Sequence, residues 1–92
     1  MDKELLKQNL TDQGFLIVYE WTDEPGTVYE EHSHKGRVAF YVTKGSLIFS
    51  GGIEQTLGPG EFIEVPVGVK HTALVGNEGC EYVVGQEIEG DA

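Results

Sequence analysis

The sequence contains a single cysteine, Cys80, among its 92 residues, so the chain cannot form an intramolecular disulfide. Nothing in it therefore requires an oxidising compartment. No apolar run approaches the roughly 20 residues that a membrane-spanning helix needs, and the amino terminus lacks the pattern of a secretory signal peptide. We therefore expect a cytoplasmic protein that does not enter a membrane.

Basic side chains are also scarce. Six Lys and Arg residues stand against sixteen Asp and Glu residues, which gives a formal net charge of -10 at pH 7. A strongly acidic chain is repelled by the phosphates of nucleic acids and by anionic membrane surfaces. The charge therefore argues against nucleic acid and membrane partners.

Glycine-rich turns divide the chain into short segments. Good helix formers, with Leu6 and Leu10 four residues apart, predict one helix over residues 2–10, closed by a turn at 11–14. The aromatic and β-branched segments that follow predict strands, and Lys44-Gly45 is expected to be the turn of a hairpin. The expected strands cover residues 15–21, 27–34, 37–43, 46–50, 53–57, 62–65, 69–75 and 80–88, and residues 89–92 are expected to be a frayed tail. Seven or eight short strands without a second helix predict one all-β domain, an antiparallel sandwich or barrel.

Only three histidines are present, and they lie in two glycine-bounded segments. Alternate residues of a strand face the same side, so His32 and His34 would place two imidazoles next to each other. His71 would add a third imidazole from a neighbouring strand. Three imidazoles that leave coordination positions open are typical of reactive metal sites. We therefore predict that these three residues bind one divalent transition metal, which could be zinc, iron, nickel or copper.

The first histidine pair lies in a segment that resembles the first motif of the cupins, a superfamily of small jelly-roll barrels. That motif is Gly, five residues, His-x-His, three or four residues, Glu, six residues, Gly. Gly26, His32, His34 and Gly45 match it. The glutamate, which is the fourth metal ligand of the family, is replaced by Val38. The resemblance thus implies the three histidine ligands but not the carboxylate.

The third histidine lies in a segment that resembles the second cupin motif. That motif is Gly, five residues, Pro-x-Gly, two residues, His, three residues, Asn. Gly60, Pro66, Gly68 and His71 match it, and Val75 stands where the family has Asn. The resemblance implies an all-β fold: a small antiparallel jelly-roll β-barrel over residues 15–88, preceded by a short N-terminal helix and turn in residues 1–14.

The resemblance leaves the activity open, because cupins include dioxygenases, isomerases, decarboxylases, storage proteins and sugar-sensing domains. One hypothesis is a metal-dependent enzyme, a dioxygenase, isomerase or lyase, that acts on a small molecule. A three-histidine iron centre would resemble the thiol dioxygenases among cupins. The alternative is a non-catalytic module that binds or senses a metal or small ligand. Small single cupins often pair through their outer sheet, which implies a homodimer.

Strand alternation extends the prediction to neighbours of the histidines. If His32 and His34 point into the barrel, Val28 and Glu30 share their face. Glu30 could then replace the missing carboxylate, as a ligand or as a base. Arg37 could hold an anionic substrate next to the metal, or it could be a surface charge paired with an acid. No other cofactor is expected.

Apolar and aromatic residues give further expectations about the faces of the barrel. By the motif register, the side chains at 38, 40 and 42 point inward, and so do those at 71, 73 and 75. The first strand carries Phe15, Ile17, Tyr19 and Trp21, which we expect to share one face that the helix or a second subunit covers. Cys80 is expected to be a buried apolar residue. Three tyrosines could line the mouth of the barrel or fill its core: Tyr29, Tyr41 and Tyr82.

Overall fold

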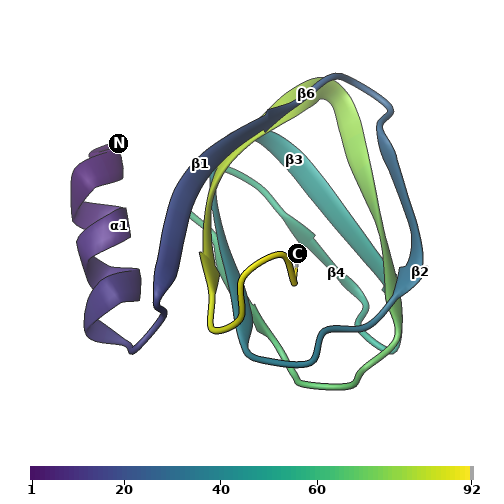
Figure 1. Cartoon of the computed structure of the whole chain (residues 1–92). Coiled ribbons are helices and arrows are strands. Elements are labelled where there is room, and N and C mark those ends of the chain that lie inside the picture. The colour runs from purple at the N-terminus through teal and green to yellow at the C-terminus, as the bar shows by residue number, and fades with distance from the viewer. Residues whose placement is uncertain (92) are drawn as a thin grey trace.

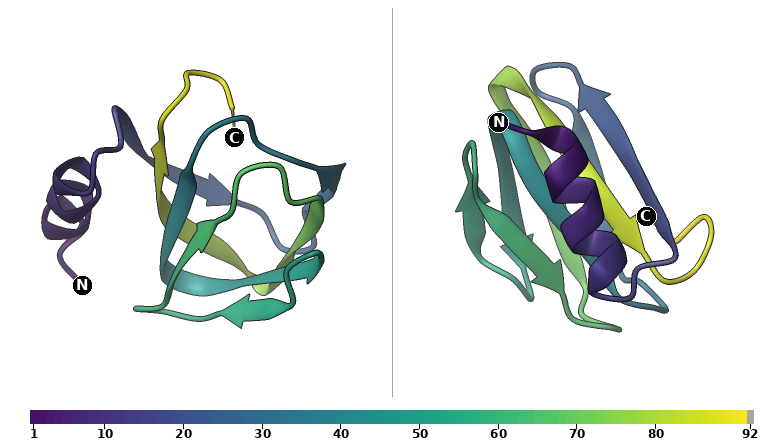
Figure 2. Two further views of the ribbon diagram at one scale, coloured as in Figure 1. Left: turned by 90° about the horizontal axis from the view of Figure 1, so that it is seen from below. Right: turned by 90° about the vertical axis from the view of Figure 1, so that its left-hand side faces the viewer.

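The computed structural model describes residues 1–91. One helix is followed by six strands: α1 (Lys3–Asp12), β1 (Ile17–Asp23), β2 (Val28–His32), β3 (Val38–Gly51), β4 (Gln55–Leu57), β5 (Phe62–Val65) and β6 (His71–Gln86). All strand pairs are antiparallel, and β6 pairs with β1, β2 and β3, while β3 also pairs with β4 and β5. The sheet curls round a central space, and α1 lies outside it (Figures 1 and 2). The predicted fold, a small all-β jelly roll with a short N-terminal helix, is confirmed.

The longest pairing joins β3 and β6, and each of these strands runs through a segment that was predicted to be a turn. Lys44-Gly45 does not end β3, and residues 46–50 continue that strand instead of folding back as a hairpin. In the same way, residues 76–79 remain within β6. The register between β3 and β6 shifts on both sides of Lys44-Gly45. Such bulges bend a strand without ending it, so fewer and longer strands replace the short ones that were expected.

Gly45 allows β3 and β6 to approach closely at this bend. Its φ angle is +75°, and a Cβ atom added to it would lie 1.9 Å from the carbonyl oxygen of Gly79. A side chain at this position would therefore have to displace the backbone of β6. Gly26 has nearly the same φ angle, +76°, but no atom lies within 4 Å of the position of its missing Cβ. The conformational need is the same at both glycines, whereas the steric need exists only at Gly45.

The main hydrophobic core fills the inside of the curled sheet. Its buried members are Val38, Phe40, Val42, Leu47, Phe49, Leu57, Ile63, Val65, Ala73, Val75, Cys80, Tyr82 and Val84. These include the residues at 38, 40, 42, 73 and 75 that the motif register predicted to point inward. Cys80 is only 3% exposed, as expected, and its burial raises the pKa of the thiol to about 11. It is therefore a protonated core residue at neutral pH.

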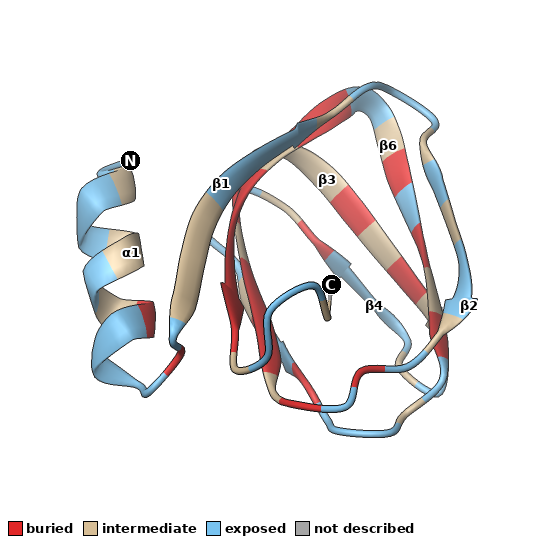
Figure 3. Ribbon diagram, in the orientation of Figure 1, coloured by how far each residue is buried: buried red, intermediate tan, exposed pale blue. Residues whose placement is uncertain are grey.

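A second core lies between α1 and the outer face of the sheet. Leu10 and Phe15 pack there against Ala39 and Val83. Buried and more exposed residues alternate in the first half of β6, but nearly every residue of its second half is buried (Figure 3). Helix α1 contacts β6, β1 and β3, so the second half of β6 is covered on both faces.

The expectation that four residues of the first strand share one face is wrong in part. Phe15 precedes β1 and is buried under α1 on the outside of the sheet. Tyr19 and Trp21 instead face the space inside the barrel. Of the two coverings considered for the outer face, the structure places the helix there. Among residues 1–91, no helix is long and apolar enough to cross a membrane.

We predict that Gly45→Ala destabilises the protein more than Gly26→Ala does. Each substitution places a Cβ on a left-handed residue, which costs about 1–2 kcal/mol. Only the alanine at 45 also collides with backbone, so its free energy of unfolding should fall by at least about 2 kcal/mol more. Urea denaturation of both variants measures the difference. Equal losses would contradict the role given to the bend.

Candidate metal centre

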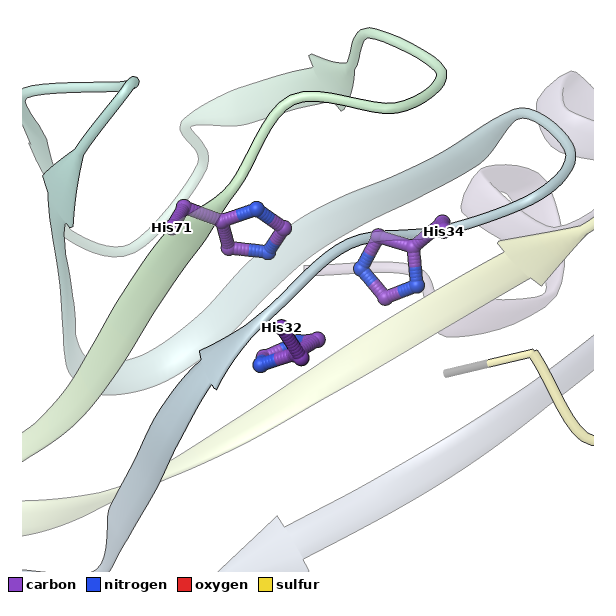
Figure 4. A group of neighbouring side chains, drawn as sticks. All are labelled: His32, His34 and His71. Carbon is purple, nitrogen blue, oxygen red and sulfur yellow. The ribbon is translucent and has the colours of Figure 1, made fainter.

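The three histidines lie close together although they come from different parts of the chain. His32 ends β2, His34 lies in the loop that follows, and His71 begins β6. The ring centroids are 4.5 Å apart for His32 and His71, 5.0 Å for His32 and His34, and 5.1 Å for His34 and His71. One ring nitrogen of each lies within 4.8 Å of the others (Figure 4). The predicted clustering of the three imidazoles is confirmed.

Each imidazole is oriented by a backbone carbonyl. The Nδ1 atom of each ring contacts one such oxygen: that of Glu30 for His32 (2.6 Å), that of Asp91 for His34, and that of Val69 for His71 (2.9 Å). A carbonyl oxygen can only accept a hydrogen bond, so each Nδ1 carries the proton and donates it. The Nε2 atom of each neutral ring is then left with a free lone pair. Bonds of this kind fix the tautomer and orientation of histidine ligands in metal sites.

The chemistry of this cluster fits a metal ion. His34 and His71 are 2% and 1% exposed, and Nε2 of His34 is buried without a hydrogen-bond partner. A buried polar atom without a partner is rare and calls for an explanation such as an ion. Burial lowers the pKa of His71, as do the neighbouring imidazoles, and this favours the neutral ring that metals require. Three neutral imidazole nitrogens suit a divalent transition metal.

The carboxylate that the sequence lacks at position 38 is not replaced by Glu30. Val38 is fully buried in the main core, and Glu30 is exposed. The prediction that Val28 and Glu30 share the face of His32 is wrong, because the register of β2 against β6 shifts between Tyr29 and His32. Such a shift reverses which residues face inward. Tyr29, rather than Glu30, therefore lies with His32 on the wall of the cavity.

Arg37 lies on the outer surface and not beside the histidines. Its guanidinium donates to both carboxylate oxygens of Glu64, at 2.9 and 3.0 Å, and to the carbonyl of Gln13, at 3.0 Å. It also covers the ring of Phe15, with the central carbon of the guanidinium 4.4 Å from the ring centroid. The alternative considered for Arg37, a surface charge paired with an acid, describes its position. It cannot hold a substrate inside the barrel from there.

The C-terminal segment makes a contribution that the sequence did not reveal. The Asp91 carboxylate accepts hydrogen bonds from the backbone N–H groups of Lys35 and Gly36, at 3.0 and 2.9 Å, while its carbonyl orients His34. Residues 89–91 are therefore not a frayed tail, and residue 92, also assigned to that tail, lies outside the described residues. No local pattern predicts these contacts, because they join positions more than 50 residues apart.

A cavity of about 200 Å³ lies beside the three histidines. Its aromatic lining consists of Tyr19, Trp21, Tyr29, Phe40, Phe49 and Tyr82, and its aliphatic lining of Leu47, Ala73 and Val84. Within the described chain, no Lys, Arg, Asp or Glu lines it. Of the three tyrosines that were considered for the mouth or core of the barrel, Tyr29 and Tyr82 thus lie in the cavity wall. The third, Tyr41, packs against Phe62 on the outer face, with ring centroids 4.5 Å apart.

The fold resembles several solved structures. An RmlC-like cupin from Shewanella frigidimarina NCIMB 400 matches with a TM-score of 0.69 and 22% identity, over 84% of this chain and 70% of that chain. KdgF from Halomonas sp. matches with a TM-score of 0.67 and 19% identity, over 82% and 72%. The polyketide cyclase RemF from Streptomyces resistomycificus matches with a TM-score of 0.67 and 26% identity, over 85% and 60%. No functionally curated protein shows significant sequence similarity to this chain.

The sequence itself matches the model of a protein family. The profile described as a cupin domain aligns with residues 19–85, which include all six strands but for the ends of β1 and β6. The match contains the three clustered histidines and all the residues that line the cavity. Fold, motifs and profile agree, and the chain belongs to the cupin superfamily.

Proposed function

We propose that this protein binds one divalent transition metal through Nε2 of His32, His34 and His71, and holds a small organic molecule in the adjoining cavity. The observation that carries the proposal is the common orientation of the rings. Three backbone carbonyls engage the three Nδ1 atoms, which leaves the lone pair of each Nε2 free, and one ring nitrogen of each histidine lies within 4.8 Å of the others. Zinc, iron, nickel and copper all accept such a donor set.

The residues around the site would bind and orient a ligand more than they would transfer protons. A divalent ion held here would supply Lewis acidity to a ligand atom beside it. The apolar and aromatic wall would exclude water from that ligand. Burial raises the pKa of Tyr29, and burial together with the hydrogen bond to Asp23 raises that of Tyr82, so both phenols stay protonated at neutral pH. Metal-dependent binding of a small molecule is therefore the function that this geometry supports best.

A second candidate is a metal-dependent enzyme, namely a dioxygenase, isomerase or lyase. It is favoured by the direct contact between the histidines and the cavity, and one structure that the chain resembles is named a polyketide cyclase. Turnover that disappears on chelation of the metal would support the enzyme. Stoichiometric metal without turnover across substrate classes would support the binding module.

We predict that the purified protein carries close to one equivalent of metal. Three substitutions should each weaken metal affinity by more than tenfold, because each removes one of three ligands: His32→Ala, His34→Ala and His71→Ala. Elemental analysis and competition titration with a chelator measure content and affinity. Glu30→Gln is the matched control, since it changes an exposed side chain next to His32 but keeps the orienting carbonyl. Wild-type metal affinity in all three alanine variants would rule the site out.

We also predict that Asp91→Ala lowers metal affinity about 10- to 100-fold, the range found when the hydrogen-bonding partners of metal ligands are removed. The substitution deletes the carboxylate that holds residue 91 against Lys35 and Gly36, so the carbonyl loses its position beside His34. The chelator titration is the readout. Glu89→Ala, at an exposed position of the same segment, should titrate like the wild type. Indistinguishable affinities for the two variants would contradict the prediction.

A further inference from the structure

We propose that the end of the cavity away from the histidines binds an organic cation, so that the ligand of this protein is a small zwitterion with a metal-binding anionic group at one end and an alkylammonium group at the other. The anionic end rests on the metal site proposed above. The cationic end rests on a different set of residues, grouped round Asp23, and can be tested without a metal.

Asp23 ends β1 and accepts hydrogen bonds from three aromatic side chains of the cavity wall. The hydroxyl of Tyr29 lies 2.8 Å from both carboxylate oxygens, the hydroxyl of Tyr82 lies 2.7 Å from Oδ2, and the indole N–H of Trp21 lies 3.0 Å from Oδ1. Asp23 itself does not line the cavity, whereas all three donors do. A carboxylate is therefore held directly behind an aromatic wall.

The direction of these hydrogen bonds decides what a ligand meets. The protons of Tyr29, Tyr82 and Trp21 are all donated to Asp23, so these groups cannot donate to a ligand at the same time. What they can offer the cavity is phenolic lone pairs and aromatic rings, whose faces carry partial negative charge. An anionic group would find no hydrogen-bond donor from these three residues, and a cation would find acceptors with a negative charge behind them.

The aromatic rings also have a suitable arrangement. The rings of Tyr19 and Trp21 meet at 84° with centroids 6.3 Å apart, so they form two walls at nearly a right angle. Walls of this kind attract ammonium and methylammonium groups through cation–π interactions. Trp21 is 51% exposed, so part of this end of the cavity wall is in contact with solvent.

The two ends of the cavity are close enough together for one small molecule to contact both. Tyr29 pairs with Ala73 and His32 pairs with His71, so across the bulge in β2 the two residues are about 7 Å apart along the sheet. In Figure 1, β2 runs from the bend of the barrel towards the loops near the C-terminus. The cavity of about 200 Å³ is smaller than the 300–1,000 Å³ or so of pockets for drug-sized ligands. Its ligand is therefore of metabolite size.

The test compares two carboxylic acids of the same shape, 4-(trimethylammonio)butanoate and 5,5-dimethylhexanoate, by calorimetry on the metal-loaded full-length protein. They differ only in the charge of the terminal group, so any difference in affinity reports the cationic end. We expect the trimethylammonio compound to bind about tenfold more tightly. Equal affinity, or tighter binding of the neutral-ended acid, would overturn the proposal.

Variants assign the preference to the residues round Asp23. Asp23→Asn removes the charge behind the wall and should reduce the preference to less than about threefold, whereas Glu54→Gln removes the same charge from an exposed position outside the cavity and should leave it unchanged. If Asp23→Asn does not fold, Trp21→Leu at its half-exposed position must reduce the preference instead. The assignment would be overturned if the folded Asp23→Asn or Trp21→Leu variant kept the full preference for the trimethylammonio compound. It would also be overturned if Glu54→Gln lost that preference to the same extent.

A second measurement separates this proposal from the metal site. Trp21 is the single tryptophan of the chain, so its fluorescence reports on this end of the cavity. Tetramethylammonium chloride, compared with sodium chloride at equal ionic strength, should change that fluorescence saturably in metal-free protein. A response without metal binding would leave the cationic end standing and the metal site refuted. Metal binding without a response would refute the cationic end alone.

Discussion

The arrangement of the whole barrel depends on one continuous antiparallel pairing, that of β3 with β6. At one end this ladder pairs Val38 with Gln86, and at the other it pairs Gly51 with His71. The bend between them occurs where Gly45 and Gly79 approach too closely for any side chain. Because β1 and β2 also pair with β6, the same bend brings the aromatic residues of β1 and the histidine of β2 to opposite walls of one cavity.

Local sequence patterns predicted the structure correctly where the strands keep their two-residue alternation. The inward positions on β3 and β6 follow from strand alternation, and the histidine spacing gave the three imidazoles that meet. The same reasoning failed for Glu30, because a register shift in β2 reverses which residues face inward and leaves no mark in the sequence. The prediction of a turn at Gly45 failed for a related reason. A glycine at the end of a strand and a glycine at a bend within a strand adopt the same backbone conformation, so the sequence alone does not distinguish them.

Contacts between distant segments could not be predicted in this way. Asp23 shares its carboxylate between side chains of β1, β2 and β6, and Asp91 joins the end of the described chain to the loop after β2. Asp23 and Asp91 are two of sixteen acidic residues. Nothing in the adjacent sequence distinguishes them from acidic residues whose side chains are solvated. The partners of Asp23 become visible only once the register of β1, β2 and β6 is known, since that register decides which hydroxyl and indole groups face its carboxylate. The partners of Asp91 become visible only once the C-terminal segment is placed against the loop after β2.

The carbonyls that orient the three rings differ in their distance along the chain from the histidine that each contacts. Those of Glu30 and Val69 are each two residues away from their histidine, whereas that of Asp91 is 57 residues from His34. The rings of His32 and His71 are thus oriented by carbonyls of their own segments. The complete imidazole cluster, and any metal bound by all three rings, therefore requires residue 91 in its docked position.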